Sequence, residues 1–398
     1  MKRILLLLLT SLFLCLAGCD PVPDEKDRQV VFVYLAGNNS LSAEGAADLA
    51  DIKSSYLPDT KDKAKVLLVF HHFTDANPQL VRLSRDRRGN LVEEIIMEYP
   101  FETNSADTRT FAGALADAQK AWPAGHYGLI LWSHGSGFLP EGYYADPKEK
   151  VATDPEFLAD DPYADLVKAQ DPVKSFAEDH GKEMDIIELG KVLNRSHFDY
   201  ILFDACLMAN VELAYEFRHC TDFLLFSPTE ILSDGFPYES MIQPLFSQQP
   251  QAAMLSIARS YMSHYREKTG IYQSATICVV RTQGMEALAA ACKPIFHNHQ
   301  EQILTLDRSV VQPYFRNNRH WFYDLDDFVG RVASESEFQA FSSALNNVVI
   351  YKVTTPYFLE IDIVHYSGLI IYIPRPEYTV LNNYYKTLAW NQATGLVQ

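Results

Sequence analysis

The chain has no excess of cationic residues, few cysteines, and neither repeats nor low-complexity tracts. Lys and Arg number only 34 against 51 Asp and Glu, which gives a net charge of −17. Because phosphate binding requires clustered cations, this balance argues against a nucleic acid partner. Six cysteines in 398 residues do not make a disulfide scaffold. With 47% hydrophobic residues, no repeat and no low-complexity tract, the chain has the composition of a folded globular protein.

A long apolar run is also missing at the amino terminus. The apolar stretch at 4–17 has 14 residues and follows Lys2 and Arg3. It is too short to span a bilayer comfortably, so it predicts a signal peptide. It ends in Leu16-Ala17-Gly18-Cys19, which resembles the lipobox of bacterial lipoproteins.

The lipobox resemblance implies a lipid anchor on Cys19. Residues 1–18 would be the signal peptide, and residues 19–28 an extended tether with two prolines. The mature protein would then be held to a membrane of the cell envelope, either periplasmic or surface-exposed. An ordinary signal peptide cleaved at small residues is the alternative.

Four cysteines remain for the folded part of the chain, namely Cys206, Cys220, Cys278 and Cys292. In an oxidising compartment they could pair in three ways, and the sequence does not select one. One of them could equally be kept free for chemistry.

The globular part alternates apolar strands with amphipathic helices. This alternation predicts an α/β fold with a mainly parallel sheet covered by helices on both faces. We expect a core over 29–244 and a further α/β portion over 245–398, packed on the core. Strands are predicted at 30–36, 66–70, 127–132, 200–203 and 223–226, and helices at 42–52, 108–122, 186–193 and 211–217.

One segment between these strands reads differently. Residues 146–181 are rich in Asp, Pro and Lys and predict a long surface loop. Its oxygen donors are of the type that calcium prefers, although they follow no EF-hand spacing. We therefore expect no essential cofactor, with calcium as an optional ligand and a solvated acidic face as the simpler alternative. The donors are Asp154, Glu156, Asp160, Asp161 and Asp165.

Two reactive residues follow predicted parallel strands. His134 comes just after the strand at 127–132, and Cys206 just after the strand at 200–203. Ligands of parallel sheets sit at the carboxyl ends of strands, so both side chains are expected at one edge. A thiolate is a strong nucleophile and an imidazole can take its proton, so the pair suffices for acyl transfer. If a helix begins at Cys206, its amino end would also favour the thiolate.

Two motifs resemble those of clostripain-like cysteine peptidases. Tyr127 to Phe138, with Ser-His-Gly-Ser-Gly at 133–137, resembles the histidine motif of the family, and Asp199 to Met208 resembles its nucleophile motif. Weaker similarity at 33–39, 227–238 and 367–374 extends the resemblance from about 29 to 390. The resemblance implies a caspase-like fold.

The resemblance also implies residue roles. Cys206 would be the nucleophile, His134 the general base and acid, and the N–H groups of Gly135 and Cys206 the oxyanion hole. Asp204 would line the pocket for the substrate residue before the scissile bond, with Asp234 as a second candidate. Two carboxylates would select Arg or Lys through charge-assisted hydrogen bonds.

The family further implies maturation by a cut between the histidine and the cysteine. Self-cleavage after one of the lysines in this interval is the corresponding hypothesis. The candidates are Lys148, Lys150, Lys168, Lys174 and Lys182.

Three functions remain in competition. The first is a membrane-anchored cysteine endopeptidase that cuts protein or peptide substrates after basic residues. The second is a non-catalytic lipoprotein of the same fold that binds peptide or glycan. A third, a peptidase cutting after Asp or Asn, is disfavoured because Asp204 would repel acidic side chains.

Overall fold

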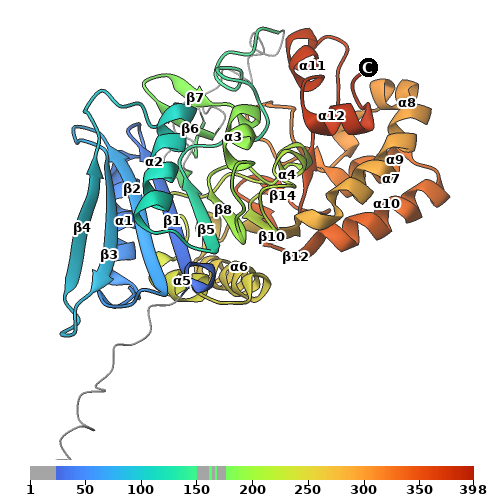
Figure 1. Cartoon of the computed structure of the whole chain (residues 1–398). Coiled ribbons are helices and arrows are strands. Elements are labelled where there is room, and N and C mark those ends of the chain that lie inside the picture. The colour runs from blue at the N-terminus through green and yellow to red at the C-terminus, as the bar shows by residue number, and fades with distance from the viewer. Residues whose placement is uncertain (1–23, 150–160, 164–165, 168–175) are drawn as a thin grey trace, which may run out of the picture.

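The computed structural model describes residues 24–149, 161–163, 166–167 and 176–398. The expected signal peptide and Cys19 therefore lie outside the described residues. The centre of the molecule is a nine-stranded sheet (Figure 1). Its strands are β1 (Gln29–Gly37), β2 (Lys65–Phe73), β3 (Gln79–Arg85), β4 (Leu91–Glu98), β5 (His126–Trp132), β8 (Tyr200–Asp204), β9 (Phe223–Phe226), β10 (Thr276–Arg281) and β12 (Val349–Thr354).

The sheet is parallel in its middle and antiparallel at both ends. The strand order is β12-β10-β9-β8-β5-β1-β2-β3-β4. The five strands from β9 to β2 are parallel neighbours. β3 and β4 extend one end and β10 and β12 the other, all antiparallel. The predicted α/β class with a mainly parallel sheet is confirmed.

Helices cover both faces of this sheet, and Figure 1 shows α2 in front of it and α1 behind it. One layer consists of α1 (Ser42–Ser54), α5 (Tyr238–Leu245) and α6 (Pro250–Arg266), which pack on one another in that order. The other runs through α2 (Thr108–Ala121), α3 (Ile186–Leu193), α4 (Val211–Glu216), α12 (Ala389–Thr394), α7 (Met285–Asn298) and α10 (Glu335–Val348). Every residue of β1 and of β8 is buried, as expected for strands covered on both faces.

Smaller elements complete the chain. Three further helices of the carboxyl-terminal portion are α8 (Gln300–Thr305), α9 (Leu325–Val332) and α11 (Thr379–Tyr385). Three two-stranded sheets are β6 (Phe176–Asp179) with β7 (Lys182–Met184), β11 (Tyr323–Asp324) with β15 (Ile370–Ile371), and β13 (Tyr357–Phe358) with β14 (Ile361–Asp362). No helix in the described ranges is both long and apolar enough to cross a membrane.

The carboxyl-terminal portion is built into the same sheet. It contributes β10, which pairs with β9, and β12, which pairs with β10. In the helix layer that contains α4, the buried carboxylate of Glu212 accepts hydrogen bonds from the Tyr372 N–H and the Tyr385 hydroxyl. Residues after 244 therefore share the core of the residues before it.

The amino-terminal tether is docked at its end. Glu25–Asp27 form a 3-10 turn, where an extended chain was expected. The N–H of Gly125 donates to the Glu25 carbonyl at 2.7 Å, just before β5. The last residues of the expected tether thus lie against the sheet.

One local expectation is wrong. Part of the expected surface loop at 146–181 folds as β6, in which Phe176, Ala177 and Asp179 are buried. β6 has only four residues, Phe176–Asp179, which is too short for an apolar–polar alternation to be recognised in the sequence. The cap of α2 is Asp107, whose carboxylate accepts from the Arg109 N–H.

Candidate active site

Three loops meet at the carboxyl edge of the central strands. β5 pairs with β1 on one side and with β8 on the other, all parallel. β1 therefore delivers the turn that begins at Asn38, β5 delivers Ser133 and His134, and β8 delivers Ala205 and Cys206. The expectation that the histidine and cysteine motifs share one sheet edge is met.

The two motifs touch through Gly135. A Cβ atom at this position would lie 2.5 Å from the Cys206 carbonyl oxygen and 3.0 Å from the Ala205 Cβ. Because real Cβ atoms do not approach other atoms so closely, only glycine fits here. The backbone that follows His134 thus lies directly against the backbone of Cys206.

The chain makes a tight turn after β8. Leu207 adopts a left-handed conformation with φ of 60°, and its N–H donates to the Thr229 carbonyl at 2.9 Å. The next helix, α4, begins only at Val211, where the Asn210 side chain caps it. The idea that a helix starts at Cys206 and favours its thiolate is therefore wrong, because the turn separates the two.

His134 is held by contacts on two sides. The side chain is buried, and Nε2 lies 3.0 Å from the Ser40 hydroxyl. Its carbonyl accepts a hydrogen bond of 3.2 Å from the Ala177 N–H of β6. The same turn that carries Ser40 also holds this hairpin, since the Asn39 side chain donates to the Glu178 carbonyl at 2.8 Å. Sequence reasoning missed Ser40, although it directly follows the segment 33–39 that resembles the family.

Cys206 is fully buried beside the segment that follows β9. The N–H of Ile231 donates to Sγ at 3.2 Å. An N–H that points at sulfur stabilises negative charge there. The Ile231 N–H therefore provides the stabilisation of the thiolate that we had expected from the amino end of a helix.

Asp204 ends β8 in a cluster of tyrosines. It is fully buried, and Oδ2 accepts a hydrogen bond of 3.0 Å from the Tyr238 hydroxyl. Burial raises the pKa of Tyr238, Tyr261 and Tyr265 well above 10, and the Asp204 charge adds to this in each case. A buried carboxylate and neutral phenols thus line one region, two residues from Cys206.

A second buried carboxylate borders this region. Asp48 on α1 accepts a hydrogen bond of 2.6 Å from the Trp132 indole N–H. Its charge also contributes to the raised pKa of Tyr238 and Tyr265. Sequence reasoning missed Asp48. The sequence did offer one indication, because Asp48 is an acidic residue next to Leu49 on the buried face of a helix.

Asp234 has a different environment. Its side chain is 54% exposed, and Oδ2 lies 2.6 Å from the Lys268 ammonium. His264 approaches the same oxygen to 3.9 Å. A cation of the chain itself therefore engages this carboxylate, whereas Asp204 is buried among tyrosines.

Residues 161–163 and 166–167 pack near the segment 230–233, whose Ile231 contacts the Cys206 sulfur. Val167 forms an antiparallel bridge with Leu232, and the Ser233 N–H donates to the Leu166 carbonyl at 2.9 Å. The guanidinium of Arg316 binds both Asp161 and the buried Glu230. We call residues 161–163 and 166–167 the strap.

This arrangement also bears on calcium. Asp161, one of the five candidate ligands, is engaged by Arg316 at 2.6 and 2.7 Å. The other four candidates lie outside the described residues, as do Lys150, Lys168 and Lys174. Lys148 and Lys182 are described and are exposed.

The other cysteines are poor nucleophiles. All four cysteines in the described ranges are free, and Cys220, Cys278 and Cys292 are buried. Burial raises the pKa of Cys220 to about 12, and it also raises the pKa values of Cys278 and Cys292. Thiols that resist ionisation attack slowly, which leaves Cys206 as the cysteine placed for chemistry.

Comparison with known proteins agrees with this geometry. The model of the clostripain family, Peptidase_C11, matches residues 33–155 and 163–395. None of the curated proteins matches the chain.

Two solved structures are similar over nearly the whole chain. An inactive zymogen C11 protease from Parabacteroides distasonis is 31% identical, with a TM-score of 0.77, over 94% of this chain and 99% of that one. A secreted C11 cysteine protease from Bacteroides thetaiotaomicron, in complex with an irreversible peptide inhibitor, is 27% identical, with a TM-score of 0.73, over 92% of this chain and 98% of that one. The family match and these similarities decide between enzyme and non-catalytic binder: the chain belongs to the clostripain family and is a cysteine peptidase.

Proposed function

We propose that the protein is an endopeptidase that cuts after Arg or Lys, with Cys206 as nucleophile and His134 as proton carrier. His134 takes the thiol proton, and the thiolate attacks the scissile carbonyl carbon. The N–H groups of Gly135 and Cys206 stabilise the oxyanion. His134 then protonates the leaving amine and a thioester forms. Water activated by His134 hydrolyses the thioester and restores the thiol.

The buried carboxylate of Asp204 is the observation that carries the preference for a basic residue. It lies two residues before Cys206 and accepts a hydrogen bond from the neutral Tyr238 hydroxyl. A long cation that reaches this region would gain a charge-assisted hydrogen bond, whereas an acidic side chain would be repelled. We propose Asp234 as an outer contact for the same cation, reached when Lys268 is displaced.

Reporter peptides test this assignment. Short peptides ending in Arg, Lys, Asp or Asn before a fluorogenic amide are offered to wild type, Cys206→Ala, His134→Ala and Asp204→Asn. We expect cleavage after Arg or Lys only, loss of activity in the first two variants, and a selective rise of KM in the third. Asp234→Asn is the matched carboxylate control, with a smaller expected effect. Equal cleavage after Asn would refute the specificity.

We propose that the described state needs activation. Cys206 and His134 are both at most 1% exposed, and Leu232, next to the Ile231 that donates to Cys206 Sγ, is bridged by Val167 of the strap. Self-cleavage after a lysine between the two motifs would release this segment. Intact mass after incubation of wild type and Cys206→Ala tests this, and an uncut but fully active wild type would exclude it.

We propose that no cofactor is essential, because thiol, imidazole and backbone donors complete the reaction. Calcium would act, if at all, on the acidic segment between the motifs. Chelator-treated enzyme should retain reporter cleavage, and restoration of a lost activity by calcium alone would refute the proposal.

We propose that Cys19 carries a lipid. The support is the Leu16-Ala17-Gly18-Cys19 sequence. The protein should partition with membranes, and Cys19→Ser should release it without changing reporter cleavage. A wild type that stays in the aqueous phase would overturn the anchor.

A further inference from the structure

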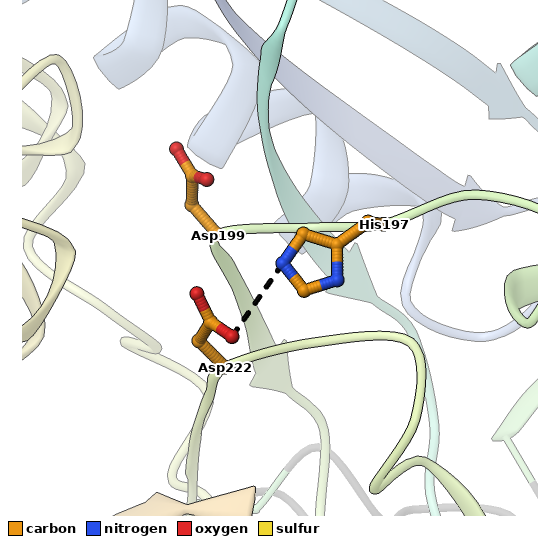
Figure 2. A group of neighbouring side chains, drawn as sticks. All are labelled: His197, Asp199 and Asp222. Atoms are coloured by element: carbon orange, nitrogen blue, oxygen red, sulfur yellow. Dashed lines mark ion pairs between the residues drawn. The ribbon is translucent and has the colours of Figure 1, made fainter. Parts of the chain in front are cut away.

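A cluster of metal-ligating side chains lies at the sheet edge away from the candidate active site. His197 and Asp199 lead into β8, and Asp222 leads into β9, so all three precede the amino ends of adjacent parallel strands (Figure 2). His126 is the first residue of β5, the next strand over. These residues take no part in the proposed reaction.

Backbone pairing fixes the positions of these side chains. Phe198 is buried and bridges Thr221 in the parallel sense. Because neighbours on an extended chain alternate in direction, His197 and Asp199 point away from the core together. Asp222 follows Thr221 as Asp199 follows Phe198, and its N–H donates to the Phe198 carbonyl at 3.2 Å.

The donor atoms have the spacing of metal ligands. Nε2 of His197 lies 3.5 Å from Oδ1 of Asp222, and one ligand atom from each of the three residues lies within 4.8 Å of the others. Ligands at about 2.0–2.1 Å from a tetrahedral ion are separated by roughly 3.3 Å. Small side-chain rotations would therefore complete the geometry.

Outer contacts support the same interpretation. Nδ1 of His126 lies 3.0 Å from Oδ2 of Asp199, an arrangement that orients a ligating carboxylate. A cavity of about 540 Å³ borders His197 and Asp222, so water can fill a fourth position. The side chains of these two residues are more than half exposed, which leaves the site open to an ion from solution.

We infer that His197, Asp199 and Asp222 bind a divalent first-row transition metal, with zinc as the best match to one imidazole and two carboxylates. Calcium prefers oxygen ligands alone, so the histidine argues against it. The ion would offset the repulsion between the Asp199 and Asp222 carboxylates. It would also link the amino end of β8 to the amino end of β9. Its effect would be on folding stability, because the opposite end of β8 carries Cys206.

Zinc binding by the full chain tests this inference. The Cys206→Ala form is used, because a reactive thiolate also binds zinc. Titration with zinc chloride by calorimetry should show one ion per chain, and thermal unfolding should shift upward with zinc. Neither zinc binding nor the shift in unfolding temperature requires peptidase activity. A failure of this inference can therefore be distinguished from a failure of the proposed function.

Variants at the cluster complete the test. His197→Ala and Asp222→Asn should weaken zinc binding at least tenfold, and His126→Ala on the order of tenfold. His219→Ala is the matched control, since this histidine is exposed near the same edge but is not one of the three ligands. Unchanged zinc binding in His197→Ala and Asp222→Asn, no zinc binding at all, or tighter binding of calcium than of zinc would overturn the inference. Metal-free unfolding temperatures identify any variant that is merely misfolded.

Discussion

The Ser40 hydroxyl lies 3.0 Å from Nε2 of His134, although the two residues are 94 positions apart. A hydroxyl can donate to a neutral imidazole nitrogen or accept from a protonated one. Ser40 can therefore hold the ring through both halves of the proposed proton transfer, and we assign it as a positioning residue.

Ser40→Ala should lower kcat about fivefold, since a hydrogen bond of this kind contributes about 1 kcal/mol. Ser40 is exposed, so folding should be nearly unaffected. The pH profile of kcat should move, because the hydroxyl contacts the ring nitrogen, while KM for an Arg reporter should stay constant. Ser40→Thr keeps the hydroxyl and should keep most of the activity. Equal activity and an equal pH profile in Ser40→Ala and wild type would contradict the assignment.

Gly135→Ala should abolish reporter cleavage and lower the free energy of unfolding by about 1–3 kcal/mol. The added methyl group would lie 2.5 Å from the Cys206 carbonyl oxygen, so the two motifs would have to separate. Gly113→Ala is the matched control, because its Cβ would meet nothing within 4 Å on α2. That change should be neutral or stabilising by about 0.5–1 kcal/mol. Chemical denaturation measures both variants, and a fully active Gly135→Ala would show that the contact is not required.

Arg316→Met should destabilise the protein by about 3–5 kcal/mol. The guanidinium is almost fully buried, and its loss leaves the Glu230 carboxylate buried without this cation. The second variant, Arg316→Met with Glu230→Gln, removes the stranded charge and should recover part of the loss. Urea unfolding of both variants gives the comparison. If the double variant is no more stable than the single one, the stranded charge is not the cause.

Glu212 should make stability fall as the pH rises. Burial raises the pKa of its carboxyl to about 7, against 4.5 in the unfolded chain. The folded state therefore holds a proton that the unfolded state releases, and stability declines between about pH 4.5 and 7. The shift corresponds to a decline on the order of 3 kcal/mol. Glu212→Gln should remove this decline in a series of urea unfolding curves, and an unchanged pH slope in the variant would refute the cause.

The sequence was most informative where one physical pattern dominates. Continuous apolar runs such as 30–36 predicted the central strands, because strands buried on both faces have no polar alternation. The turn residues after them predicted which loops share an edge. β10 was not predicted, because Thr276 and Cys278 weaken its apolar run and its partner β12 lies about 70 residues later.

Sequence reasoning named the candidate residues that follow strands and missed those that do not. His134, Gly135, Asp204 and Cys206 each end or follow β5 or β8. Ser40 and Asp48 reach the site through packing that links distant segments, which local sequence does not encode. The prediction of a helix at Cys206 was wrong for a related reason. The turn at Leu207 depends on a hydrogen bond to Thr229, which is distant in the sequence.

The pairing of β5 with β8 also bears on how the protein could be divided. Any break between residues 149 and 161 separates the chain into an amino-terminal piece with β1 to β5 and a carboxyl-terminal piece with β6 to β15. The two pieces remain joined along a central ladder of five paired residues, from Gly128 with Tyr200 to Trp132 with Asp204. Two separately expressed halves should therefore assemble into one particle, a split peptidase whose histidine and cysteine come from different polypeptides.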